Sequence, residues 1–203
     1  MKLFIQVKEI IRKYHLYALK DVFLFMVILL FFHVVWKIFA SNFMAVDFIM
    51  NSALYLAEKV FYASKWVLEV LNVNVTTFDE LTIGGAMHKN VIYYAPNNGI
   101  VYVNSSCSGL KQFYQWVFLM LLFPGPWKHK AWFIPLGIVI IHIVNIFRIV
   151  GMTYVTINLP HQWDYIHDWI MRPFFYIVMF LLWVWWNEKF HLKARKVKAE
   201  AKS

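Results

Sequence analysis

Long runs of apolar residues constrain this chain more than any other feature of its sequence. Four of them approach or reach the length needed to cross a hydrocarbon core of about 30 Å, and they cover residues 22–40, 108–123, 132–153 and 169–186. Inside a bilayer every backbone polar group must be paired, so such runs fold as helices. We therefore expect an all-α polytopic membrane helical bundle of about four spans, forming a single membrane domain over residues 1–203.

Residues 43–71 form a fifth apolar stretch of a different kind. This stretch carries five charged side chains: Asp47, Glu58, Lys59, Lys65 and Glu69. Charges inside a spanning helix are costly. We therefore predict an amphipathic helix that lies on the membrane surface, although the sequence alone leaves open whether this segment crosses.

Residues 72–106 change character from apolar to β-prone. Val91–Tyr94 and Ile100–Val103 are rich in β-branched and aromatic residues, and the turn-forming pairs Gly84-Gly85 and Asn97-Asn98 separate the stretches. These features predict a small extracytoplasmic insert containing a β-hairpin.

The basic residues indicate the orientation of the chain. Its formal net charge is +9, and Lys and Arg gather before the first run, between the second and third runs, and after the last run. By the positive-inside rule these regions face the cytoplasm. We expect a basic cytoplasmic segment at 1–21 and a basic cytoplasmic tail at 188–203. This distribution is the one expected of a chain inserted in a lipid bilayer, and it argues against nucleic acid as a partner.

Cys107 is the only cysteine, so the chain has neither an internal disulfide nor a multi-cysteine metal site. It lies directly before the second run, where Ser105 or Ser106 is expected to cap a helix that begins at 108. A thiol at a helix N-terminus is stabilised as the reactive thiolate. Lys111, one turn further on, would add a positive charge. The alternative is a buried, inert cysteine.

Arg148 lies inside the third run, near its predicted outer end. An arginine within an apolar helix costs several kcal/mol and by default marks a functional or paired site. Asn145, three residues earlier, is on the same helical face. The alternative is an arginine that reaches to the outer headgroups.

His167 precedes the fourth run and can act as a general base and acid near neutral pH. His161 lies six residues upstream in the same loop, and the sequence does not decide between them. Asp168 is a candidate supporting residue for either histidine. The predicted topology places nucleophile, cation and base on the same outer side of the membrane, as acyl transfer requires.

Three pieces of sequence carry a family resemblance: Ser106-Cys-Ser-Gly109, then Asn145-Ile-Phe-Arg148, then His167. In this order, between residues 100 and 190, they resemble the exosortase/archaeosortase family of membrane cysteine transpeptidases, and a histidine in third place resembles its bacterial branch. The resemblance implies a catalytic helical core at 107–187 in which Cys107 is the nucleophile, Arg148 binds the oxyanion or substrate carbonyl, and His167 moves protons, with no cofactor or metal.

The resemblance also implies partners and a location. The substrate would be a protein with a C-terminal sorting signal, made of a transmembrane segment and a basic tail. It would be cleaved at the outer face of the bacterial cytoplasmic (inner) membrane and transferred to an acceptor amine or lipid. Two alternatives stay open from the residues alone: a non-catalytic small membrane assembly subunit, and a small transporter.

The charge pattern yields a topology prediction. A reporter that is active only in the cytoplasm, fused after Ser203, should be active, because the basic tail is retained on the cytoplasmic side. An inactive fusion would place the tail outside, and would contradict both the topology and the shared outer site.

Overall fold

A computed structural model describes residues 16–44 and 46–193. The predicted basic segments at 1–21 and 188–203 therefore fall largely outside the described residues. Two long helices, α2 (Leu16–Met44) and α5 (Trp127–Asn158), form the body together with a third helical stretch from Pro160 to His191. Within these three elements the stretches Leu19–Ala40, Trp127–Asn158 and Pro160–His191 are long and apolar enough to cross a membrane. The chain is a multi-pass membrane protein.

The third helical stretch changes its winding along its length. It consists of η3 (Pro160–Gln162), α6 (Trp163–Ile166), η4 (His167–Met171), α7 (Arg172–Trp186) and η5 (Asn187–His191). The segments η4 and η5 are π-helical turns. The sequence predicted a span over 169–186, and the helical conformation extends beyond both ends of that range.

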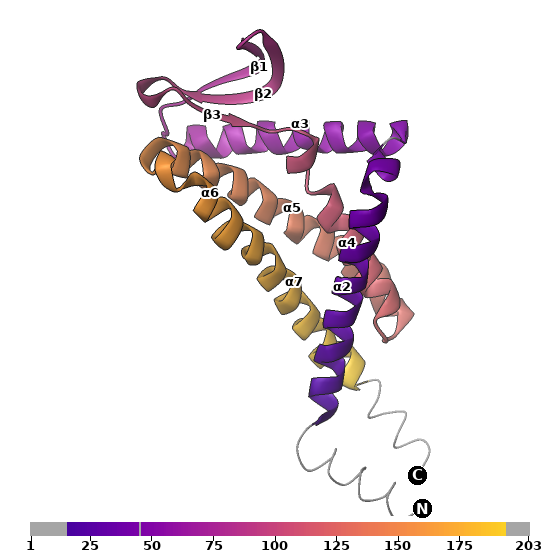
Figure 1. Cartoon of the computed structure of the whole chain (residues 1–203). Helices are drawn as coiled ribbons and strands as arrows, with labels where there is room; N and C mark the ends of the chain where they lie inside the picture. Colours follow the sequence, from indigo (N-terminus) through magenta and orange to yellow (C-terminus); the bar gives the residue numbers. More distant parts are fainter. Residues whose placement is uncertain (1–15, 45, 194–203) are drawn as a thin grey trace, which may run out of the picture.

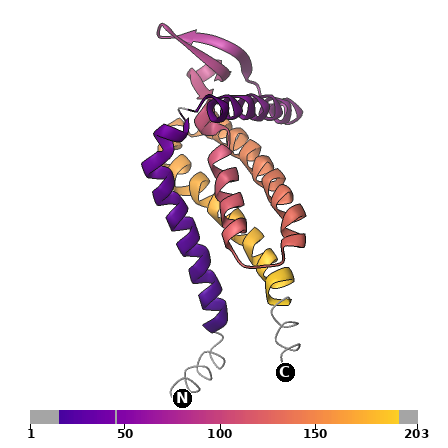
Figure 2. The ribbon, with the colours of Figure 1, turned by 90° about the vertical axis from the view of Figure 1, so that its right-hand side faces the viewer.

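The short helix α4 (Leu110–Leu122) corresponds to the predicted span at 108–123. Its 13 residues rise about 20 Å, which is less than the hydrocarbon thickness. It runs beside α5 within the bundle (Figures 1 and 2). A multi-pass helical fold is therefore present, and the crossing by α4 that would make four spans stays a prediction.

Helix α3 (Asp47–Val70) lies across one end of the bundle instead of along it (Figures 1 and 2). Its buried side, which includes Val60, Phe61 and Leu68, packs against Ile149 and Val150 near the end of α5. This orientation is the one expected of the amphipathic surface helix predicted at 43–71.

Beyond α3 lies a three-stranded antiparallel sheet of β1 (Thr76–Ile83), β2 (Ala86–Tyr94) and β3 (Gly99–Tyr102) (Figure 1). The predicted β-prone stretches pair as β2 and β3, with Val91 opposite Tyr102. A third strand, β1, extends the predicted hairpin. Sequence reasoning predicted only a hairpin region here and did not assign β1, which contains Asp79 and Glu80, residue types depleted in strands. Gly84 and Gly85, both with positive φ, form its two-residue turn to β2.

At the opposite end of the bundle, the loop between α4 and α5 packs on the last helix. A Cβ at Gly125 would come within 2.7 Å of the Trp186 ring. Lys130 is buried there, and its Nζ donates to the carbonyls of Phe123 at 2.7 Å and Leu121 at 3.4 Å. These carbonyls lie at the C-terminal end of α4, where no helical N–H group remains to pair with them. The sequence treated Lys128 and Lys130 as equivalent loop cations, and the structure separates them: Lys130 ties two helices together, whereas Lys128 is exposed.

Replacing Lys130 should therefore destabilise the fold. Lys130→Met leaves two carbonyls at the end of α4 without their donor, and each unpaired buried group costs about 1–3 kcal/mol. We expect a clear fall in the midpoint temperature of unfolding in detergent micelles. Lys128→Met is the matched control and should change the midpoint little. Equal effects of the two substitutions would show that Lys130 acts only through its charge.

Candidate active site

A cavity of about 360 Å³ lies where the start of α4, the C-terminal half of α5 and the last helix converge. Its lining residues come from segments far apart in the sequence and include Cys107, Arg148 and His167. The three residues proposed from sequence are therefore brought together around one space. This end of the bundle is the one covered by α3 and the sheet (Figure 1).

Cys107 ends a short 3₁₀ turn, η2 (Ser105–Cys107), and not the first turn of a helix. The Asn104 side chain caps this turn by accepting a hydrogen bond from the Ser106 N–H at 3.0 Å. Helix α4 starts only at Leu110, because Gly109 adopts a φ of +80° that interrupts the helical path. The predicted capping by Ser105 or Ser106 and the helix start at 108 are thus wrong. Cys107 precedes the helix by three residues, so the expected help from the helix dipole is indirect.

Two contacts fix the half-buried Cys107. Its Sγ lies 3.7 Å from the carbonyl oxygen of Tyr102, at the end of β3. Its own carbonyl accepts a 2.7 Å hydrogen bond from Nδ2 of Asn145, which is fully buried on α5. Asn145, predicted as a supporting residue, therefore positions the backbone that carries the thiol.

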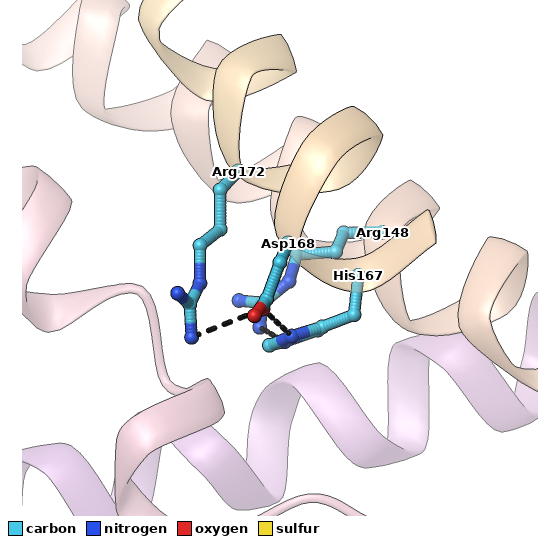
Figure 3. Close-up of polar contacts among 4 residues, drawn as sticks. All are labelled: Arg148, His167, Asp168 and Arg172. Atoms are coloured by element: carbon cyan, nitrogen blue, oxygen red, sulfur yellow. Dashed lines mark hydrogen bonds and ion pairs between the residues drawn. The ribbon is translucent and has the colours of Figure 1, made fainter. Parts of the chain in front are cut away.

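Arg148, His167, Asp168 and Arg172 form a continuous polar chain (Figure 3). Nη2 of Arg148 lies 3.0 Å from Nε2 of His167, and Nδ1 of His167 lies 2.7 Å from Oδ1 of Asp168. Arg172 Nη2 contacts the same carboxylate oxygen at 3.3 Å. An arginine can only donate and a carboxylate only accepts, so the pattern assigns the imidazole proton to Nδ1 and leaves Nε2 as the acceptor. His167 is neutral in this arrangement.

His167 is also held by its local backbone and by a ring contact. The Trp163 ring stacks on the imidazole with 4.8 Å between centroids. His167 opens the π-helical turn η4, and such turns are frequent at functional sites. Neither the ring contact nor the π-helical turn can be predicted from hydrophobic periodicity, which predicts an ordinary helix here.

Of the remaining predicted residues, Lys111 lies at the cavity and His161 does not. Lys111 lines the cavity, with its Nζ 5.9 Å from the centre of the Trp36 ring. His161 is exposed in η3 and does not line the cavity, so only His167 of the two candidate histidines contacts Arg148 and shares the cavity with Cys107.

Sequence reasoning missed several lining residues, notably Arg172, Gln112, Gln115 and Tyr176. Arg172 carried a usable signal, because it lies inside an apolar run, as Arg148 does. Within residues 16–44 and 46–193, no group of three His, Cys, Asp or Glu side chains is placed to hold a metal ion.

Comparison with known families decides the class of this protein. A family model described as transmembrane exosortase matches residues 20–185. The chain belongs to the transmembrane exosortase family. The match extends beyond the stretch of resemblance at 100–190 and includes α3, the sheet and most of α2. Membership supports a membrane transpeptidase or protease. No curated protein and no solved structure matches the chain.

Gly109 allows a prediction about the turn that carries the thiol. A Cβ at this position would lie 3.1 Å from Nδ2 of Asn145 and would disturb its bond to Cys107. Gly109→Ala should cost about 1–2 kcal/mol for the left-handed backbone, plus about 1–3 kcal/mol for the carbonyl that loses its donor.

The matched control is Gly84→Ala in the β1–β2 turn. Its φ is also positive, at +59°, but no atom lies within 4 Å of the added Cβ. It should show the backbone cost alone when the midpoint temperatures of unfolding are compared. Equal losses in the two variants would contradict the role assigned to Asn145.

Proposed function

We propose that this exosortase is a cysteine transpeptidase. It cleaves a C-terminal sorting signal at the outer face of the bacterial cytoplasmic membrane and transfers the protein to an acceptor amine or lipid. The observation that carries the proposal is that Cys107, Arg148 and His167, from three separate segments, line one cavity. Family membership supports the same class of chemistry.

The first step is acylation. His167 Nε2 takes the thiol proton, and the Cys107 thiolate attacks the carbonyl carbon of the scissile peptide bond. A donor to the developing oxyanion is needed, and Arg148 is the nearby cation. The carbon–nitrogen bond then breaks, the leaving amine takes the proton from His167, and a thioester remains on Cys107.

The second step transfers the acyl group. The acceptor nucleophile gives its proton to His167 and attacks the thioester carbonyl. The carbon–sulfur bond breaks, and the proton returns to the sulfur. Asp168 keeps the imidazole in the tautomer that exposes Nε2, and it stabilises the imidazolium that forms in each step.

The resting geometry also suggests how the substrate activates the base. Arg148 occupies the lone pair of His167 Nε2, so the histidine cannot accept a proton while this bond persists. Arg148 Nε is buried and has no hydrogen-bond partner among the described residues. A substrate carbonyl that draws the guanidinium to itself frees Nε2, and base activation is thereby tied to substrate binding.

The decisive experiment is to search for the acyl-enzyme. In membranes from native cells, the peptide containing Cys107 should carry a hydroxylamine-sensitive adduct detectable by mass spectrometry. Cys107→Ser should insert normally and abolish processing, because a hydroxyl lacks thiolate character at neutral pH. Normal processing by this variant would favour the non-catalytic assembly subunit instead.

Substitutions at the cation and the base sharpen the same prediction. Lysine cannot reproduce two directed donors, so Arg148→Lys should lower the rate of adduct formation by roughly a hundred- to a thousand-fold. Its Cys107 should still react with iodoacetamide. His167→Ala should be similarly impaired, whereas His161→Ala, outside the cavity, is the matched control and should be nearly normal. Retained activity in Arg148→Lys would remove Arg148 from the catalytic set.

A further inference from the structure

A second hollow, of about 680 Å³, opens on the side of the bundle between α2 and the last helix. We call it the α2–α7 groove. Met26 and Leu30 on α2 and Ile177 and Phe180 on α7 are among the residues that line it, and all four are exposed. Both helices are candidate membrane spans, so the groove opens toward the lipid.

The groove exists because α2 diverges from α7. The two helices meet at Phe25, whose ring lies 4.7 Å from that of Trp183 and 5.5 Å from that of Phe180. About two turns further along, α2 packs on α4 instead, with Phe32 5.6 Å from Phe118. The space between α2 and α7 therefore widens toward the end that carries the active-site cavity, as Figure 1 shows.

The groove adjoins the active-site cavity. Gln115, Arg172 and Tyr176 line both spaces. Most of the residues that line the groove are apolar, and its polar lining residues include Gln115 and Arg172, which also line the cavity. Its lining runs over nearly the whole stretch from Trp169 to Phe180, which corresponds to about 16 Å of helix, or about half of the hydrocarbon thickness.

We propose that this groove binds the apolar transmembrane helix of the substrate and directs the extended segment before that helix to Cys107. The inference rests on the proposed function. A helix in the groove would have its outer end at the shared residues. There its first N–H groups and the extended segment lack helical partners. The side chains of Gln115 and Tyr176 can hydrogen-bond this segment, whereas an acyl chain offers them no polar group.

The occupant can be tested with a defined probe. The probe is a synthetic peptide with about 20 Leu and Ala residues, an uncharged polar N-terminal extension and a lysine-rich C-terminus. It is mixed with the full chain in phosphatidylcholine vesicles. The photo-reactive residue p-benzoylphenylalanine replaces Met26 or Ile177 in the groove. Val139, which is exposed on α5 and does not line the groove, is the matched control position.

We expect the yield of cross-linked peptide at Met26 and Ile177 to exceed that at Val139 by about tenfold, which corresponds to a preference of about 1.4 kcal/mol. Equal yields, or adducts to phosphatidylcholine without excess peptide, would overturn the proposal and identify a lipid-filled groove. Adducts to a second copy of the chain would overturn it in favour of a self-association surface.

A second measurement separates this inference from the proposed function. Ile177→Trp narrows the groove and should lower the adduct on Cys107 in native membranes about tenfold, while leaving the alkylation of Cys107 by iodoacetamide unchanged. Val139→Trp should alter neither. Absence of the adduct in the unmodified chain would contradict the proposed function itself. An adduct that is undiminished in Ile177→Trp would contradict only the groove.

Discussion

The positive charge of Arg148, set inside an apolar helix, is the constraint on which the organisation of this end of the molecule depends. Such a charge is costly in a membrane unless it is paired. Here it lies 3.0 Å from His167 and 5.8 Å, at its guanidinium carbon, from the centre of the Phe175 ring. Both partners belong to the last helix, so Arg148 joins that helix to α5.

The pairing of Arg148 with His167 determines which other groups must be held in place. His167 can accept from Arg148 only as the Nδ1–H tautomer, which Asp168 holds and which Arg172 supports in turn. Asn145, one turn before Arg148 on α5, holds the turn that carries Cys107. A single helix therefore orients both Cys107 and His167. This explains why a short bundle can assemble a site from segments sixty residues apart.

The cations at the two ends of the bundle have different surroundings. At the end with the described termini, Lys130 is enclosed by carbonyls of α4 and by the Trp127 ring, 4.4 Å away, and is committed to holding helices together. At the other end, Arg148, Lys111 and Arg172 line a cavity and retain access to a ligand. What distinguishes Lys130 from the three cations that line the cavity is therefore access. Position in the sequence did not separate them, because Lys128 and Lys130 read alike.

The sequence by itself determined the membrane class and the apolar helices. It predicted a surface helix over 43–71 without excluding a crossing, and it proposed Cys107 and Arg148, with one of two histidines, for a shared site. These follow from the length of apolar runs and from the cost of placing Arg148 among them, both of which are local properties. Only the tertiary structure decided that His167 and not His161 reaches Arg148, that Asn104 caps the Cys107 turn, and that α2 and α7 diverge into a groove. Each depends on where distant segments pack. The π-helical turn at η4 and the positive φ at Gly109 change the direction of the side chains that follow them. Neither feature can be predicted from the periodicity of the sequence.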